Sequence, residues 1–304
     1  MAEVWRSPER VLMGPGPSTS HPRVLRAMAQ QTIGHLDPDF LALLDRIRAG
    51  LQRLFQTENA VTFAVSGTGM AGMETCMTNL VAPGDRVLVG VHGFFGERLA
   101  DLARRCGGVV TRVEAPWGQP LPIDEMVAAI RRERPAVVAC VHAETSTGVL
   151  QPVEEIAAAA REAGALMLLD TVTSLGGVEV RVDAWGIAAA YSGVQKCIGC
   201  PSGLAPVTFS PAAIAKRQAR PDPFPSFYFD VALLAQYWGQ ERTYHHTAPA
   251  NMLFALHEAL QMIEEEGLAA RFTRHRRNAR ALRAGLQAMG LRLFANERYW
   301  LPSL

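Results

Sequence analysis

An aspartate and a lysine each follow an apolar, strand-like run of this sequence, and together they could do chemistry. Asp170 closes the run 166–170, and Lys196 follows the run 188–192. A buried carboxylate needs a cationic partner. Desolvation of a lysine with few charged neighbours lowers the pKa of its amine and favours the neutral nucleophile of imine formation. The simpler alternatives are an Asp that caps the turn Thr171–Ser174 and a Lys that snorkels to solvent from a strand end.

A glycine-rich turn, Ser66-Gly67-Thr68-Gly69-Met70, joins the expected strand 61–65 to an expected helix. Its glycines expose backbone N–H groups at the helix N-terminus, where a phosphate binds well, and Thr68 adds a hydroxyl. The glycine spacing departs from the dinucleotide-binding fingerprint, and the lysine of a P-loop is absent. By itself this turn is weak evidence for a phosphate site.

Phe95 lies in the segment Gly93-Phe94-Phe95-Gly96, after the expected strand 86–91. An aromatic side chain there could stack on a flat ring, although burial in the core is the simpler explanation. The four features together fit pyridoxal 5′-phosphate (PLP). This cofactor needs a lysine for a Schiff base, a carboxylate for its ring nitrogen, donors for its phosphate and a sandwich for its ring. We expect all four features at one edge of one sheet.

Short apolar runs alternate with helical patterns along most of the chain. Several runs are apolar throughout rather than alternating, which is typical of strands covered on both faces in a parallel α/β sheet. The expected strands are residues 61–65, 86–91, 109–113, 137–142, 166–170, 188–192 and 204–209. The expected helices are residues 69–80, 95–105, 123–132, 153–163, 230–239, 249–266 and 267–289.

The fold class that follows is α/β: a large domain with a mostly parallel seven-stranded sheet flanked by helices, plus an incomplete small C-terminal α+β domain. We expect an N-terminal arm (1–20), a large PLP-binding domain (21–250) and the start of the small domain (251–304). Pro221–Pro225 is expected to be a linker. Leu291–Phe294 is expected to begin a strand with no later element to pair with it, so we expect part of the second domain to be missing.

Composition excludes several classes of protein. The chain has 304 residues and a net charge of +1, without the basic excess of a nucleic-acid-binding protein. We expect no secretory signal and no membrane span. The five cysteines are scattered, which favours reduced thiols of a cytoplasmic enzyme over disulfides. Cys197 and Cys200 form a C-x-x-C pair, but they lack a second pair of ligands, so we expect no metal.

Five segments, in this order, resemble the class V branch of the fold-type I PLP enzymes. The resemblance is strongest to the alanine–glyoxylate and serine–pyruvate aminotransferases, and it extends from Met13 to the end of the chain. The segments are Ser66–Gly69, His142–Gly148, Asp170–Gly177, Ser192–Lys196 and Tyr244–Thr247.

The resemblance implies a role for each residue around the cofactor ring. Lys196 would form the Schiff base and move the proton of the substrate α-carbon, and Asp170 would pair with the ring nitrogen. Val172 would pack beneath the ring, and Phe95 would stack above it where many relatives have Trp. Thr145 would reach the oxygen side of the ring.

The resemblance also implies a phosphate cup and a homodimer with shared active sites. Tyr244 and Thr247 would reach the phosphate bound by the neighbouring subunit. His245 and His246 have no catalytic role in the family, and we expect them to be structural. The phosphate cup would be formed by Thr68, Gly69, Met70 and Gln195.

The implied reaction moves the amino group of alanine or serine to glyoxylate or pyruvate by a ping-pong mechanism. Family members are longer than this chain, and the arginine that grips the substrate carboxylate is expected beyond Leu304. One alternative is another class V PLP enzyme, such as a pyridoxamine–pyruvate aminotransferase or a cysteine desulfurase. Another is a truncated PLP-binding protein without turnover. A dinucleotide-binding protein is disfavoured, because no acidic residue closes the expected strand 86–91.

Overall fold

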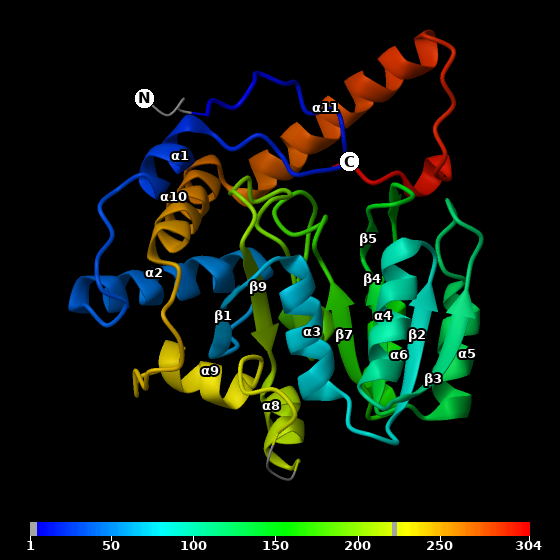
Figure 1. The fold of residues 1–304 in the computed structure, drawn as a ribbon. Helices are drawn as coiled ribbons and strands as arrows, with labels where there is room; N and C mark the ends of the chain where they lie inside the picture. Colours follow the sequence, from blue (N-terminus) through cyan, green and yellow to red (C-terminus); the bar gives the residue numbers. More distant parts are fainter. Residues whose placement is uncertain (1–4, 221–223) are drawn as a thin grey trace.

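A seven-stranded sheet forms the centre of the computed structural model, which describes residues 5–220 and 224–304 (Figure 1). Neighbouring strands follow the order β1-β9-β8-β7-β4-β2-β3. The pairs formed by β2, β3, β4, β7 and β8 are parallel, whereas β9 runs antiparallel to both β1 and β8. The predicted seven-stranded, mostly parallel sheet is therefore confirmed. The strands are β1 (Val61–Ser66), β2 (Arg86–Val91), β3 (Val109–Glu114), β4 (Val137–Val141), β7 (Leu166–Asp170), β8 (Ala189–Tyr191) and β9 (Leu204–Phe209).

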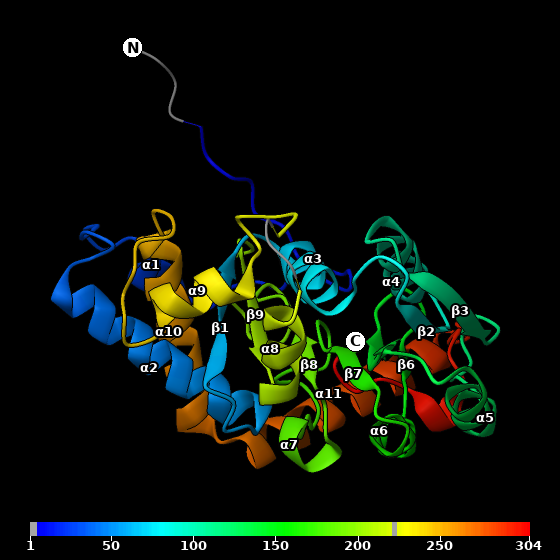
Figure 2. The same ribbon diagram turned by 90° about the horizontal axis from the view of Figure 1, so that it is seen from below.

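Helices cover both faces of this sheet, which explains why its central strands are apolar along their whole length. Helices α3 and α4 lie on one face, and α2, α5, α6 and α7 lie on the other (Figure 2). Every residue of β4 is buried. The helices are α2 (Pro38–Phe55), α3 (Gly69–Leu80), α4 (Phe94–Arg105), α5 (Ile123–Glu133), α6 (Glu154–Glu162) and α7 (Val182–Trp185).

The parallel strands bring their carboxyl ends to a single edge of the sheet. The segments that follow β1, β2, β4, β7 and β8 therefore meet there, although they are far apart in the sequence. The small hairpin of β5 (Ala143–Glu144) and β6 (Val149–Leu150) stands above β4 at the same edge. This edge is where the predicted site residues must lie if they act together.

Most of the last third of the described chain is helical, and the three helices predicted there, 230–239, 249–266 and 267–289, are confirmed. This third contains α8 (Pro211–Gln218), α9 (Val231–Trp238), α10 (Ala250–Glu266) and α11 (Leu268–Ala288), and α11 crosses above the carboxyl edge of the sheet (Figure 1). Helix α10 packs against α1 (Pro22–Met28) and α2. The predicted domain boundary at residue 250 stays a prediction. Of the predicted linker, residues 221–223 lie outside the described part of the chain.

The structure corrects several expectations about secondary structure, and α1, α7 and α8 are helices that were not predicted. Helix α2 was not predicted, although Asp37 caps its N-terminus by accepting a hydrogen bond from the backbone N–H of Asp39 and Pro38 opens its first turn. The predicted strand Leu291–Phe294 is wrong, because no described strand lies along this segment to share backbone hydrogen bonds. Instead a short 3₁₀ turn, Glu297–Tyr299, follows it. Among the described residues, no helix has both the length and the apolar character needed to cross a membrane.

A buried ion pair joins α8 to the start of α9. The guanidinium of Arg217 donates two hydrogen bonds to Asp230, at 2.9 Å and 2.6 Å, and both side chains are only 6% exposed. Asp230 also caps α9 by accepting a hydrogen bond from the backbone N–H of Ala232 at 3.0 Å. Hydrogen bonds between charged groups in the interior contribute more to stability than those between neutral groups.

We predict that Asp230→Ala lowers the free energy of unfolding by about 2–4 kcal/mol, because it removes two hydrogen bonds to the Arg217 guanidinium and the N-cap of α9. Urea unfolding at neutral pH measures the loss. The matched control is Asp101→Ala, which removes an exposed carboxylate that pairs with Arg105 within α4 and should change little. Equal effects of the two substitutions would contradict the structural role of the buried pair.

Candidate active site

Asp170 is the last residue of β7, and its carboxylate is buried at the carboxyl edge of the sheet. It is 2% exposed. Its two oxygens accept hydrogen bonds from the backbone N–H of Val172 at 2.8 Å and from the hydroxyl of Tyr191 at 2.5 Å. Burial raises the pKa of Asp170 to about 7, although the two hydrogen bonds and the charge of Lys196 act in the opposite direction. Among the described residues, no cation donates a hydrogen bond to this carboxylate.

Lys196 follows β8 and is half-buried. Its Nζ donates a hydrogen bond to the carbonyl oxygen of Pro15 at 2.8 Å. Burial lowers the pKa of its amine, while the neighbouring Cys197 and Asp170 raise it. A lysine in this setting releases its proton more readily than a surface lysine and can act as a nucleophile or base.

The segment before α1 crosses over Lys196 and leaves room for its side chain. Ser18 fixes this segment, because its hydroxyl donates to the backbone oxygens of Gln195 and Lys196, each at 2.9 Å. A Cβ atom at Gly16 would lie 2.8 Å from the Nζ of Lys196 and would displace the lysine side chain, and the φ of +134° also favours glycine. The predicted N-terminal arm therefore includes one wall of the site.

A cavity of about 690 Å³ opens beside Lys196. Thr145 and Thr173 also line it, and their hydroxyls are hydrogen-bonded to each other. The other walls come from the segment 12–19, from the turn 146–148, from α11 and from the last two residues of the chain. The cavity thus joins elements from both ends of the sequence at the edge where Asp170 lies.

The predicted phosphate turn has an open helix N-terminus. Thr68 is the N-cap residue of α3, yet its exposed side chain makes no capping hydrogen bond. Gly67 has a φ of +155°, and a Cβ there would lie 2.5 Å from that of Ala71, so the turn requires glycine. An ideal Cβ at Gly69 would lie 3.6 Å from the side chain of Val172, which places the turn next to the residues that follow β7.

Gln195 and Met70 lie close to these elements, as the predicted phosphate cup requires. The side-chain oxygen of Gln195 is buried without a hydrogen-bond partner, and the side chain lies against Gly193. Met70 is half-buried in the first turn of α3, so its backbone N–H belongs to the open helix end. The helix end at Met70 therefore offers donors to a phosphate, whereas the unpartnered oxygen of Gln195 is an acceptor.

Phe95 and Thr145 stand on neighbouring elements of the same edge. Phe95 lies in the first turn of α4 and contacts Phe94 edge to face, with ring centroids 5.3 Å apart. Thr145 follows β5 directly. Glu144 connects the two, since its carboxylate accepts a hydrogen bond from the backbone N–H of Phe95 at 3.2 Å.

Tyr244 and Thr247 do not join this group within one chain. Both are exposed, neither lines the cavity, and Tyr244 instead lies beside His35, with ring centroids 5.4 Å apart. The Nε2 of His246 forms a hydrogen bond with the hydroxyl of Ser66 at 2.8 Å. The Nδ1 of His246 lies 2.8 Å from the Nδ1 of His245. The two histidines thus tie this loop to the end of β1.

Known proteins resemble this chain in both fold and sequence. Residues 11–299 match the aminotransferase class-V family. The chain is 39% identical to the (S)-ureidoglycine–glyoxylate transaminase of Bacillus subtilis, over 97% of this chain and 76% of that protein. It is 41% identical to the alanine–glyoxylate aminotransferase of Oryctolagus cuniculus, over 96% of this chain and 75% of that protein. A solved structure of an alanine–glyoxylate aminotransferase from Nostoc sp. superposes with a TM-score of 0.97 at 50% identity, over 99% of this chain and 80% of that one.

The chain belongs to the class V aminotransferases. Its fold is that of the fold-type I PLP enzymes, and membership of the family implies PLP as the cofactor of this aminotransferase. The enzyme acts on an amino acid and an oxo acid, as transamination requires.

The residues at the edge of the sheet fit this cofactor. The buried carboxylate of Asp170 has no cationic hydrogen-bond partner, and a protonated pyridine nitrogen would supply one. The open N-terminus of α3 suits a phosphate, because its first backbone N–H groups are donors. Lys196 offers an amine of lowered pKa.

Sequence reasoning missed several residues of this aminotransferase site. Tyr191 donates to Asp170, but it reads in the sequence as one more apolar strand residue. Ser18 and Pro15 contact Lys196 from the other end of the chain, and no local pattern connects them. Glu144 stands beside the predicted Thr145, so an acidic residue at the end of a buried strand was the available signal.

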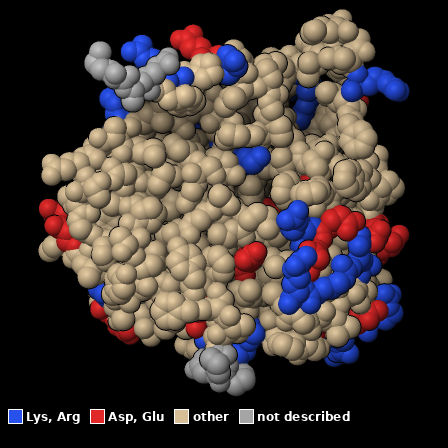
Figure 3. All heavy atoms as spheres, in the orientation of Figure 1, with Lys and Arg blue, Asp and Glu red and all other residues tan. Residues whose placement is uncertain are grey.

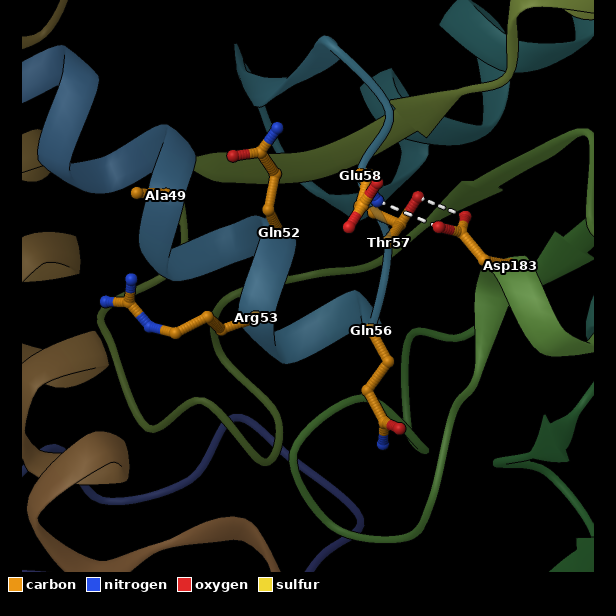
Figure 4. A pocket seen from close by; sticks show the side chains of 7 residues that line it. All are labelled: Ala49, Gln52, Arg53, Gln56, Thr57, Glu58 and Asp183. Atoms are coloured by element: carbon orange, nitrogen blue, oxygen red, sulfur yellow. Dashed lines mark hydrogen bonds between the residues drawn. The ribbon is translucent and has the colours of Figure 1, made fainter.

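A second hollow, of about 460 Å³, lies away from this chemistry (Figure 4). It is formed at the C-terminal end of α2 and by the residues before β1, so it lies toward the opposite edge of the sheet. Asp183 there accepts hydrogen bonds from the hydroxyl of Thr57 at 2.5 Å and from the backbone N–H of Glu58 at 2.9 Å. These contacts anchor β1, and none of the predicted site residues lines this hollow.

We predict that Asp170→Asn stabilises the cofactor-free protein above pH 7. The pKa of Asp170 rises from 3.8 to about 7 on folding, so the wild type loses stability as pH increases between these values. An asparagine does not ionise and can keep both hydrogen bonds, because the hydroxyl of Tyr191 can rotate to accept. The variant should gain about 2–4 kcal/mol at pH 8, and the difference should vanish near pH 4.

Thermal unfolding of the cofactor-free proteins between pH 4 and pH 8 measures this difference. Asp101→Asn, at an exposed carboxylate of α4, serves as the control. Parallel curves for the wild type and Asp170→Asn would show that Asp170 titrates normally and that its burial carries no cost.

Proposed function

We propose that this aminotransferase moves the amino group of alanine or serine to glyoxylate or pyruvate, with Lys196 and Asp170 as its catalytic residues. The observation that carries the proposal is the placement of the Lys196 amine and the buried Asp170 carboxylate at one edge of the sheet, beside a cavity of about 690 Å³. When bound, PLP supplies an electron sink and carries the amino group from one substrate to the other.

Lys196 is the base of the proposed reaction. Its Nζ takes the proton from the substrate α-carbon and later returns it, which requires a neutral amine. Burial favours that form by lowering the pKa of the amine. The carbonyl of Pro15, 2.8 Å away, can hold Nζ in place when the amine carries a proton.

Asp170 keeps a proton on the ring nitrogen. Tyr191 and the backbone of Val172 fix the orientation of its carboxylate. In this proposal the phosphate is held by Thr68, Gly69, Met70 and Gln195. Phe95 and Val172 would cover the faces of the ring, and Thr145 would donate a hydrogen bond to its oxygen side.

The lining of the cavity supports a small, uncharged side chain on the amino donor. Among the described residues around it, the ionisable side chains are Lys196, Cys197 and His275, and burial lowers the pKa of His275 to about 4. The rest of the lining is apolar, hydroxylated or glycine. Since one cofactor serves both half-reactions, the first product leaves before the second substrate binds, which gives ping-pong kinetics.

Reduction with borohydride tests the cofactor and the lysine together. The chain has only two lysines, Lys196 and Lys216, and Lys216 forms an ion pair with Asp85 at 2.8 Å. We predict that borohydride adds the mass of reduced PLP to the wild type and to Lys216→Ala but not to Lys196→Ala. A mass gain that persists in Lys196→Ala would show that Lys196 is not the residue that binds the cofactor covalently.

A second measurement determines the rate of transamination with a panel of amino donors. Alanine or serine with glyoxylate should yield glycine at rates that fall by several orders of magnitude in Lys196→Ala. Including (S)-ureidoglycine among the donors addresses the activity named for the Bacillus subtilis relative. Release of sulfide from cysteine, or PLP uptake without any turnover, would favour the alternative functions over transamination.

We also infer that the active form is a homodimer in which Tyr244 and Thr247 reach the cofactor phosphate of the neighbouring subunit. Several large apolar side chains near this loop are exposed, including Tyr244 at 57% and Phe227 at 67%. Figure 3 shows few charged side chains over α3 and α9, whereas charges gather over α4 and the strands beside it. An uncharged face with exposed aromatic residues suits burial against a second copy.

Mixing two defective subunits tests the shared site. Lys196→Ala lacks the base, and the double variant Tyr244→Phe/Thr247→Ala lacks the proposed phosphate contacts. A mixed dimer would contain one site with both defects and one intact site, so we predict more activity than the sum of the two separate proteins. Activity equal to that sum would place both sets of residues in the same subunit's site. Sedimentation should give twice 33.0 kDa.

A cytoplasmic location is part of the same proposal. All five cysteines lie in described parts of the chain, and none of them forms a disulfide. Reduced thiols are usual in that compartment.

A further inference from the structure

Glu144, the last residue of β5, has a carboxylate that is fully buried, with 0% of the residue exposed. Among the described residues, no cation contacts it. Four neutral donors satisfy it instead. Oε2 accepts from the backbone N–H groups of Phe95 at 3.2 Å and Gly96 at 3.3 Å. Oε1 accepts from the backbone N–H of Ser146 at 3.1 Å and from its hydroxyl at 2.7 Å.

These donors come from two elements that carry predicted cofactor contacts. Phe95 and Gly96 belong to the first turn of α4, whose helix dipole favours a negative charge. Ser146 belongs to the turn that follows Thr145. The hydroxyl of Ser146 also accepts a hydrogen bond from the backbone N–H of Phe94 at 3.0 Å. This contact is a second link between the turn and the first residues of α4.

The packing around Glu144 leaves no freedom for another arrangement. A Cβ atom at Gly93 would lie 2.3 Å from the Cγ of Glu144 and 2.5 Å from its Cδ. Glycine is therefore needed at this position to admit the carboxylate beneath α4. The sequence Gly93-Phe94-Phe95-Gly96 thus has a reason beyond the placement of an aromatic ring.

A simple helix cap would not require a buried charge. Ser, Thr or Asn can satisfy the first N–H groups of a helix, and burying a carboxylate costs more than burying these side chains. The charge of Glu144 also acts on the cofactor site, because it raises the pKa of Asp170. A negative charge on Glu144 therefore adds to the attraction of this site for a cationic group.

We propose that Glu144 is a positioning residue of the cofactor site, which locks Phe95 and Thr145 at fixed places and adds negative charge next to Asp170. This inference rests on the proposed function, since it assumes that Phe95 and Thr145 contact the cofactor. Glu144 itself does not touch the reacting atoms in this proposal.

The test compares Glu144→Gln with Glu155→Gln, which changes an exposed carboxylate in the first turn of α6. Both proteins are purified with cofactor, and PLP affinity is then measured by titrating the cofactor-free forms. We expect Glu144→Gln to bind PLP at least about tenfold more weakly, as is typical when the support of a direct ligand is removed. Glu155→Gln should match the wild type.

A pH titration of the visible absorbance band separates positioning from mere stability. A negative charge raises the pKa of every group near it, so loss of the Glu144 charge should lower the pH midpoint of the band. The other ionisable groups that interact electrostatically with Asp170 or Lys196 stay unchanged in this variant: Tyr191, Cys76, Cys140 and Cys197. A purely structural role for Glu144 would leave the midpoint in place.

A second variant keeps the inference testable if Glu144→Gln does not fold. Ser146→Ala removes one donor and the contact to Phe94 but leaves the buried carboxylate, and it should weaken PLP binding in the same direction to a smaller extent. If the wild type binds PLP and both variants match it in affinity and midpoint, this inference is wrong and the proposed function stands. If the wild type itself takes up no PLP, the proposed function fails as well.

Discussion

The structure depends on one electrostatic constraint: Asp170 is a buried carboxylate with no cationic hydrogen-bond partner of its own. Burial raises the pKa of this group, and only a neutral hydroxyl and a backbone N–H hold it in place. Such an arrangement is costly unless a positively charged ligand completes it. The cost is understandable in a class V aminotransferase, because the ring nitrogen of PLP is the group that would complete it.

The parallel sheet explains how one short edge collects residues from so many parts of the chain. Each parallel strand delivers the residues that follow it to the same edge, so Gly69, Phe95, Thr145, Asp170 and Lys196 become neighbours. Helices on both faces keep water away from the strands, and this burial shifts the pKa values of Asp170 and Lys196 toward each other. The same burial that stabilises the sheet therefore prepares the chemistry.

Elements at both ends of the described chain complete the site. The segment with Pro15, Gly16 and Ser18 closes over Lys196, and α11 with His275 forms another wall. The β5–β6 hairpin contributes Thr145 and is fastened to α4 through Glu144. The rigid sheet supplies the charged groups, and these smaller segments determine the shape of the space in front of them.

The sequence by itself determined the sheet and the order of its strands along the chain, because continuous apolar runs separated by turn residues have few other solutions. It also predicted Asp170 and Lys196 as site residues, since ionisable residues at or shortly after the ends of buried strands stand out from their surroundings. It did not predict α2, whose capping signals at Asp37 and Pro38 are local and short, and it wrongly predicted a strand at Leu291–Phe294, where no partner strand is present. Only the tertiary structure showed that Tyr191 supports Asp170, that Ser18 fixes the segment over Lys196 and that Glu144 joins two elements. These contacts link residues far apart in the chain, and no periodicity records them, because they arise from the way the strands and helices pack.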